Sequence, residues 1–181
     1  MSDWPVTVVE PLPTIHPWSL ESIGSIESGG PRLTETASAV YPAANLALFI
    51  PFSLTKSVTV TKLFCLNGAV VNGNIDLGIY DVYGVRLISS GSVAQAGVNV
   101  IQSFDIADTR MGSGNFYFAV AMNNIVGTLF SAAMFAAIAP AITGMAEMAA
   151  AFPLPAVAVF AQITGNYIPV IGALINPRTV V

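Results

Sequence analysis

The sequence predicts an all-β protein, an antiparallel β-sandwich of jelly-roll type. Short apolar runs with a two-residue alternation recur along the chain, and turn signals separate them without intervening helical patterns. In one such run Ile75, Leu77 and Ile79 share one face of an extended strand. Asp81 then opens a tight turn and Gly84 closes it, at the positions where a type I turn favours these residues. These observations predict an antiparallel hairpin, and the neighbouring segments repeat its pattern.

The first six predicted strands are Leu46–Phe52, Ser57–Leu66, Asn74–Tyr80, Val85–Ser89, Val98–Ile106 and Phe116–Met122. In the fifth, the even positions from Val98 and Val100 onward form the inward face, with Gln102 as a polar exception. The sixth is apolar on both faces, which is typical of a central strand or of one covered by a subunit contact. A late strand is predicted at Ala156–Gln162, and Tyr167–Ile171 suits a sheet edge because an edge tolerates Pro169.

Residues 1–44 are predicted to form an extended N-terminal arm. Prolines interrupt every regular element there. Trp4, Trp18 and Ile23 are nevertheless spaced through it, whereas a disordered tail is normally poor in such residues. The arm is therefore expected to lie along a neighbouring surface, anchored to a partner by these three side chains. A mobile tail with incidental aromatic residues is the alternative.

The sandwich domain is predicted to span residues 45–181, with an Ala-rich insertion at about residues 129–152. Its small residues would let it pack against copies of itself or against a neighbour. Residues Thr143–Ala151 are expected to form a short helix, ended by the proline that follows. The uncharged stretch Ile125–Ala146 is long enough to cross a bilayer, but it contains a proline and lacks basic flanks. A membrane span is therefore the weaker interpretation.

Composition narrows the function classes. Charged residues make up 9% of the chain, against about 25% in a typical soluble domain, and 54% of residues are hydrophobic. A chain with so few charged residues is expected to have much of its surface covered by other subunits or by lipid. A net charge of −4 with six basic residues argues against a nucleic-acid partner. The single cysteine, Cys65, excludes a disulfide within the chain and lies in an apolar strand, as a buried thiol does.

No catalytic, cofactor or metal site is predicted. A Ser-His-Asp arrangement would need the sole histidine, His16, which lies in the Pro-rich arm. Asp76 and Asp105 could face each other as a glycosidase pair, and Asp105 with Asp108 could hold calcium, but neither has a supporting motif. Structural roles for these carboxylates are favoured.

Exposed aromatic residues offer the best small-ligand hypothesis. Tyr80 is expected on the outer face of its strand, and Tyr83 at the hairpin tip. Together with Tyr117 they could stack on sugar rings as a glycan contact. Cross-strand packing and interface contact are the favoured interpretation of all three.

The chain also contains a series of short sequence motifs. They are Ala44-Asn-Leu-Ala-Leu-Phe-Ile-Pro-Phe52, Val58-Thr-Val-Thr-Lys-Leu63, Asn67-Gly68, Gly73-Asn-Ile-Asp-Leu-Gly-Ile-Tyr80, Arg86-Leu87 with Gly91-Ser92, Phe116-Tyr-Phe-Ala119, Phe152-Pro-Leu-Pro155 and Tyr167-Ile-Pro169. In these motifs the chain resembles a family of tailed-bacteriophage virion proteins. Such domains occur in decoration, neck, baseplate and fibre proteins and resemble carbohydrate-binding β-sandwiches. The resemblance implies no catalytic residue, and it does not include the arm.

Residues and resemblance together lead to one functional expectation. The chain is expected to be a non-enzymatic structural subunit of a phage virion, either capsid decoration or a tail or fibre component. Its assembly in the host cytoplasm is expected, because no signal peptide is visible. It would form a homo-oligomer, with a trimer as the expected state, and would dock on capsid or tail subunits through its arm. The alternative is a glycan-binding module of a phage tail that recognises a host receptor. Neither nucleic acid nor membrane is expected as a partner.

Overall fold

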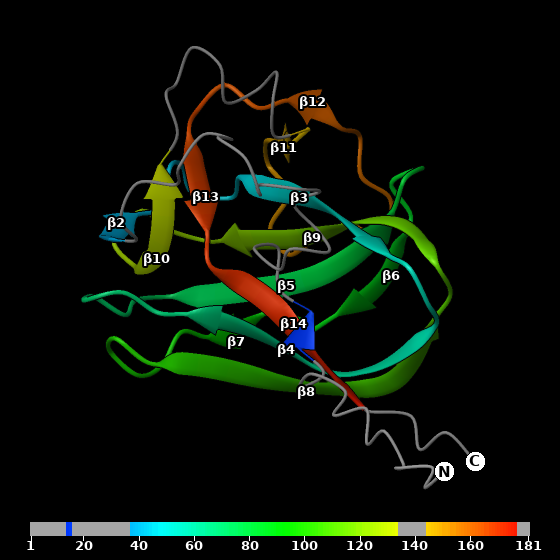
Figure 1. Cartoon of the computed structure of the whole chain (residues 1–181). Helices are drawn as coiled ribbons and strands as arrows, with labels where there is room; N and C mark the ends of the chain where they lie inside the picture. Colours follow the sequence, from blue (N-terminus) through cyan, green and yellow to red (C-terminus); the bar gives the residue numbers. More distant parts are fainter. Residues whose placement is uncertain (1–13, 16–36, 134–143, 177–181) are drawn as a thin grey trace, which may run out of the picture.

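The computed structural model describes residues 14–15, 37–133 and 144–176, and this part of the chain is all-β, without a helix (Figure 1). The strands are β1 (Thr14–Ile15), β2 (Ala37–Val40), β3 (Ala47–Leu54), β4 (Val58–Leu66), β5 (Asn74–Asp81), β6 (Arg86–Ser89), β7 (Val93–Ala94), β8 (Ile101–Met111), β9 (Gly114–Met122), β10 (Thr128–Ala133), β11 (Ala146–Met148), β12 (Ala161–Gln162), β13 (Tyr167–Pro169) and β14 (Ile171–Asn176).

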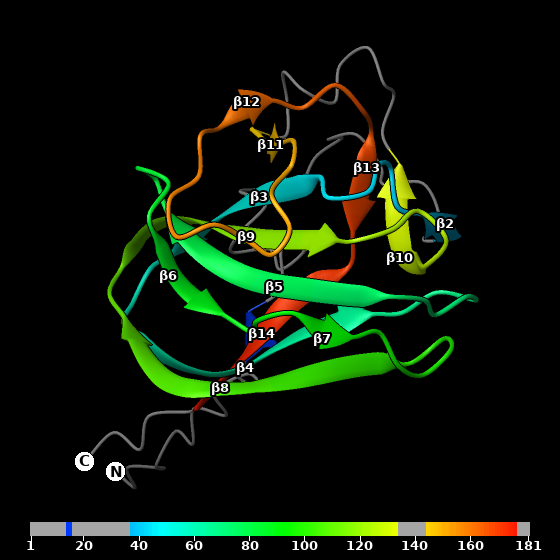
Figure 2. The same ribbon diagram turned by 180° about the vertical axis from the view of Figure 1, so that it is seen from behind.

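The strands form three antiparallel sheets in a sandwich-like arrangement. A four-stranded sheet has the order β1-β14-β4-β8, and a seven-stranded sheet has the order β12-β11-β3-β9-β5-β6 with β7 on β5. Figures 1 and 2 show the four-stranded sheet packed below β3, β9 and β5. A three-stranded sheet, β13-β10-β2, lies at one end. The predicted fold class, all-β with antiparallel sheets packed as a sandwich, is confirmed.

The main core lies between the two larger sheets. Ile75, Leu77 and Ile79 are all buried in it, which confirms the predicted face of the hairpin. Phe52 of β3 and Phe118 of β9 stack in the same core, with ring centroids 4.1 Å apart. Full burial of such side chains contributes about 1.5–3 kcal/mol each, so this layer dominates the stability of the sandwich.

The seven-stranded sheet is covered on its outer face as well. A segment of residues 149–160, here called the covering segment, crosses this face in front of β9 (Figure 2). Beneath it lies a second apolar cluster that includes Phe49 and Ala119 from the sheet and Leu154 from the covering segment. This explains why β9 is apolar on both faces: it is a central strand, between β3 and β5, and the chain itself covers it.

The predicted turn between β5 and β6 is confirmed. The Asp81 carboxylate accepts hydrogen bonds from the backbone N–H groups of Tyr83 (2.9 Å) and Val85 (2.8 Å). The N–H of Gly84 donates to the Asp81 carbonyl over 3.2 Å. Gly84 has φ +84°, a left-handed conformation that glycine adopts without a steric penalty.

The strand predicted at Val98–Ile106 begins and ends later in the structure, because β8 spans Ile101–Met111. Val98 and Val100 are about half exposed and do not face the core, so their predicted inward direction is wrong. The reason is local backbone geometry: Gly97 and Asn99 both have positive φ, which turns the chain before β8 starts.

The helix predicted at Thr143–Ala151 is wrong over its described residues. Ala146–Met148 form β11, which pairs antiparallel with β3. A helix of this length is marginal by itself, and β3 offers backbone hydrogen bonds together with an apolar outer face. Gly144, at φ +63°, also departs from helical geometry. Tertiary pairing therefore outweighs the helix propensity of the alanines.

The late strands are partly as predicted. Of Ala156–Gln162 only the last two residues form a strand, β12, since the rest belongs to the covering segment. β13 is an edge of the three-stranded sheet and contains Pro169, as expected. The sequence interpretation missed β1, β2, β7, β10 and β14, and β1 and β2 fall within residues 1–44, the predicted arm. β10 falls in the predicted Ala-rich insertion, of which residues 134–143 lie outside the described part.

Candidate interaction surface

A buried cluster of side-chain amides lies at one end of the sandwich. Asn67 follows β4, Gln95 follows β7 and Gln102 lies on β8. The Asn67 side-chain NH₂ donates to the Gln102 side-chain oxygen over 2.9 Å, and the Gln95 NH₂ donates to the Asn67 side-chain oxygen over 3.0 Å. Asn67 and Gln95 are both buried. Because a buried amide is costly unless it is hydrogen-bonded, this cluster holds its three segments in one arrangement.

The same amides fasten the loops through backbone groups. The NH₂ of Asn67 donates to the Ala96 carbonyl (2.6 Å), and the NH₂ of Gln95 donates to the Thr128 carbonyl (2.8 Å). The Gln95 side-chain oxygen accepts from the N–H of Asn72 over 2.9 Å. Three loops that are distant in sequence, residues 67–73, 94–100 and 123–128, are therefore tied to each other.

A pair of hydroxyl groups adds β2 to this unit. Ser38 Oγ donates to Thr128 Oγ1 over 3.1 Å and accepts from the N–H of Ala69 over 2.8 Å. Thr128 Oγ1 also bonds both backbone groups of Val70. Gly68 lies between them, and a Cβ at this position would overlap Ser38 Oγ. A larger residue than glycine is thus excluded at the centre of the unit.

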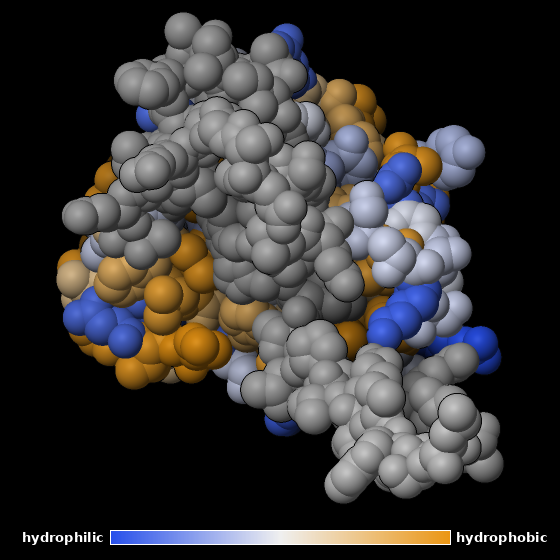
Figure 3. Space-filling model, in the orientation of Figure 1, coloured by the Kyte–Doolittle hydropathy of each residue, from blue (hydrophilic) through white to orange (hydrophobic). Residues whose placement is uncertain are grey.

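On this rigid unit, large apolar side chains face solvent. Those more than a third exposed are Val40, Val70, Val98, Val100, Ile101, Ile125 and Val126, with exposed fractions between 44% and 65%. We call this surface the apolar end. It lies at the left of Figure 1, and Figure 3 shows hydrophobic colour gathered at the lower left, with a few hydrophilic residues among it.

The apolar end contains no charged residue. The sequence has none between Lys62 and Asp76, between Arg86 and Asp105, or between Arg110 and Glu147, and the loops of the apolar end fall in these intervals. Contiguous exposed apolar surface typically marks an interaction site. Because the loops are already ordered by buried hydrogen bonds, a partner would bind without an entropic cost of ordering them.

Cys65 lies beneath the amide cluster, with its Sγ 3.6 Å from the Asn67 side-chain oxygen. Burial raises the pKa of this thiol to about 12. The group therefore stays protonated at neutral pH, where the thiolate is the reactive form. Its role is packing, as the sequence predicts.

Asp76 fastens the covering segment. Its carboxylate is buried on the outer face of β5 and accepts hydrogen bonds from the N–H of Leu154 (3.0 Å) and the hydroxyl of Ser89 (3.0 Å). The Arg86 guanidinium donates to the Leu154 carbonyl, and the Tyr80 hydroxyl donates to the Pro155 carbonyl over 2.5 Å. Burial raises the pKa of Asp76, although the hydrogen bonds that Asp76 accepts from Leu154 and Ser89 and the nearby charge of Arg86 act in the opposite direction.

A pH-dependent prediction follows from the raised pKa of Asp76. Between its unfolded value of 3.8 and its higher folded value, the folded state binds more protons, so stability falls as pH rises. In the Asp76→Asn variant the side chain does not titrate, so this pH dependence of stability is absent. The difference in free energy of unfolding, variant minus wild type, should therefore increase as the pH rises above about 3.8 in denaturant titrations. A constant or decreasing difference would contradict this assignment.

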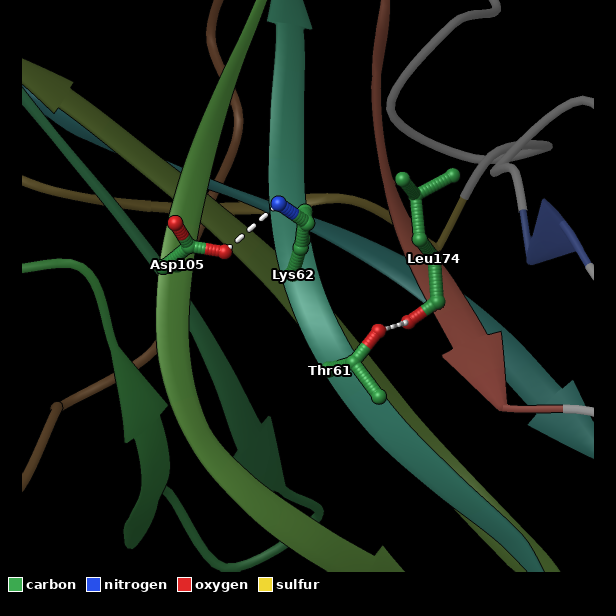
Figure 4. Close-up of polar contacts among 4 residues, drawn as sticks. All are labelled: Thr61, Lys62, Asp105 and Leu174. Carbon is green, nitrogen blue, oxygen red and sulfur yellow. Dashed lines mark hydrogen bonds and ion pairs between the residues drawn. The ribbon is translucent and has the colours of Figure 1, made fainter.

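Asp76 and Asp105 do not form a catalytic pair. Asp76 lies on the outer face of the seven-stranded sheet, beneath the covering segment, whereas Asp105 is exposed on the four-stranded sheet. Figure 4 shows Asp105 of β8 pointing toward Lys62 of β4, and the two make an ion pair of 2.7 Å. The exposed Asp108 adds no third ligand, and the described residues contain no group of three His, Cys, Asp or Glu side chains placed to hold a metal.

The three tyrosines do not share one surface. Tyr83 is 84% exposed at the hairpin tip, whereas Tyr80 is fully buried. The predicted outer face for Tyr80 is correct, but the covering segment lies over it, and its ring packs edge-on against Phe49. Tyr117 is half-buried against Phe160, with ring centroids 4.7 Å apart.

The predicted arm anchors Trp4, Trp18 and Ile23 lie outside the described residues, as does His16. Of the region before residue 37 the structure describes β1, which pairs with β14 at the edge of the four-stranded sheet. In the described ranges no helix has the length and apolar character needed to span a bilayer.

No family model, curated protein or solved structure matches this chain. The sequence interpretation missed the amide cluster, although it contained one signal for it. Gln102 breaks an apolar face, and a polar residue at an inward position requires a buried partner. The three charge-free intervals were a signal for the apolar end.

Proposed function

We propose that this chain is a non-enzymatic structural subunit of a bacteriophage virion that works by binding copies of itself and neighbouring virion proteins. The observation that carries the proposal is the apolar end, a rigid and uncharged surface with seven large apolar side chains exposed. A single subunit gains nothing from exposing such a surface, whereas a subunit in an assembly buries it.

The charge distribution favours a second copy as one partner. Each chain carries a net charge of −4, so two copies repel each other at most orientations. Contact through the apolar end brings no like charges together. We propose a closed oligomer, with a trimer as the expected state, in which apolar ends meet.

The finer features of the proposal rest on the sequence. The resemblance to tailed-phage virion proteins includes the segment from Ala44 to Asn123, which contains β3 to β9, and it supports a jelly-roll type of sandwich in a capsid-decoration or tail and fibre role. Trp4, Trp18 and Ile23 are proposed to anchor the arm on a capsid or tail subunit. Recognition of a host glycan, the alternative function, would depend on Tyr83, the one of the three tyrosines that is largely exposed.

The proposal predicts self-association that depends on the apolar end. Light scattering on a size-exclusion column should show a discrete oligomer for the wild-type chain. The double variant Ile125→Asn, Val126→Asn should associate at least about tenfold more weakly, because two apolar contacts are lost, and should shift toward the monomer. These side chains are exposed, and their turn is held by Asn124, whose side-chain oxygen accepts from the N–H groups of Val126 and Gly127. The fold should therefore persist.

Val159→Asn is the matched control. Val159 is an exposed apolar residue in the covering segment, away from the loops of the apolar end. The control should keep the wild-type oligomer. A wild-type chain that stays monomeric at about 100 μM, where even weak assemblies form, would refute self-association through this surface.

A further inference from the structure

β8 is the free edge of the four-stranded sheet. It pairs with β4 on one side and, within the described residues, has no strand on the other. In an antiparallel strand successive residues direct their N–H and C=O groups alternately to the two sides, so half of these groups in β8 face away from the sheet. β8 is 11 residues long, and a strand of this length at a sheet edge offers a row of backbone groups that a second chain can pair with.

Over Phe104–Met111 of β8, the order of buried and exposed residues is the same in both directions from a point between Ala107 and Asp108. Phe104, Ile106, Thr109 and Met111 are the more buried positions, and Asp105, Ala107, Asp108 and Arg110 are the exposed ones. Two consecutive exposed residues at the centre accompany the register shift opposite Val60 and Lys62. A two-fold axis between Ala107 and Asp108 therefore places buried positions opposite buried ones and exposed positions opposite exposed ones.

The same axis matches charge. It places Asp105 of one copy opposite Arg110 of the other, twice by symmetry. Asp105 Oδ1 lies 2.7 Å from Lys62 Nζ in an ion pair. Figure 4 shows the other carboxylate oxygen of Asp105 directed away from Lys62. Arg110 is exposed and makes no ion pair with another described residue. A register shifted by two residues in one direction would instead put Asp105 opposite Asp108, which is repulsive.

From the free edge, the matched facing pattern and the charge complementarity, we propose that two copies of this chain pair edge to edge through β8. The strands run antiparallel about an axis between Ala107 and Asp108 and join the two four-stranded sheets into one. The residues paired about this axis, Phe104–Met111, lie outside the apolar end, which includes only Ile101 of β8, and the contact does not depend on a virion role. In an assembly it would link two oligomers.

Cysteine cross-linking tests the axis. In Ala107→Cys the two thiols lie diagonally across it, with Cα atoms about 6 Å apart, within the range that a disulfide spans. Ser103→Cys is the control: Ser103 is exposed on the same strand, but its two copies are about 30 Å apart in this register. Cys65 is common to both variants and buried.

After mild oxidation of the full-length protein, Ala107→Cys should give about tenfold more covalent dimer than Ser103→Cys on a non-reducing gel. Adding Arg110→Glu should reduce this dimer strongly, and Arg110→Lys should retain it. Equal cross-linking of the two cysteine variants, or no effect of Arg110→Glu, would overturn the β8 contact. Cross-linking that persists with Ile125→Asn, Val126→Asn would show that it is independent of the apolar end.

Discussion

Replacement of Asn67 by alanine is expected to lower the free energy of unfolding by about 3 kcal/mol and to weaken self-association as well. Asn67 is fully buried and makes hydrogen bonds to the side chains of Gln95 and Gln102 and to the Ala96 carbonyl. Alanine removes all of these bonds at once and takes a hydrogen-bond partner from the buried side chain of Gln95. The loops that carry the exposed valines would then lose their common support.

Denaturant unfolding measures the first effect, and light scattering measures the second. Hydrogen exchange gives a local readout, since the N–H of Asn99 donates to the Gly68 carbonyl only while the loops stay together. Asn115→Ala is the control, because Asn115 is an exposed asparagine that bonds Ser53 over 2.6 Å. It should cost less than about 0.5 kcal/mol. Equal losses in the two variants would show that the amide cluster has no special role.

Replacement of Gly84 by alanine is the second large effect expected, at about 3 kcal/mol. Gly84 has φ +84°, and a Cβ there would overlap the carbonyl oxygen of Ala158 in the covering segment. The N–H of Ala158 also donates to the Gly84 carbonyl over 2.8 Å. The new methyl group therefore strains the turn and separates the hairpin from the covering segment.

Gly91→Ala separates the two causes. Gly91 has a similar φ of +69°, but nothing lies within 4 Å of a Cβ built there. It carries the backbone penalty alone, about 1 kcal/mol. The excess loss in Gly84→Ala should appear as faster hydrogen exchange of the Ala158 amide. Similar losses in both variants, with Ala158 still protected, would mean that the covering segment does not depend on this contact.

β5 connects the two regions that these predictions address. It starts at Asn74 beside the apolar end and finishes at Asp81 in the turn that holds the covering segment. Asp76 fixes Leu154 near its middle, while the opposite face of the strand carries the main core. A single strand thus supports a binding surface, a core and a protected outer face.

Local chemistry allowed the sequence to predict much of this fold. The alternation of Ile75, Leu77 and Ile79 and the turn at Asp81 and Gly84 depend on neighbours in the chain, so they were correct. The strands β3, β4, β6 and β9 also lie close to their predicted positions, for the same reason. The start of β8 was predicted three residues too early. The alternation of apolar residues at Val98 and Val100 suggested a strand, but Asn99 has a positive φ and interrupts the extended backbone there.

The candidate surface depended on long-range contacts. Asn67 and Gly68 have the composition of an ordinary turn, and Gln95 and Gln102 lie many residues further on. Nothing local indicates that these amides meet, because their hydrogen bonds close only when β4, β7 and β8 come together. The same holds for Tyr80, whose exposure is decided by a segment more than 70 positions later, since its hydroxyl bonds Pro155 at a separation of 75 residues.

The sequence by itself determined the all-β class, most strands of the sandwich, the hairpin turn and the uncharged character of the loops, because alternation, turn chemistry and charge are properties of short segments. Only the tertiary structure decided that three of those loops form one rigid apolar end, that the alanine-rich region contributes a strand in place of a helix, and that β8 has no second neighbour among the described strands. Each of these outcomes depends on which distant backbone and side-chain groups satisfy one another, and pairing over such separations is set by the packing of the whole chain.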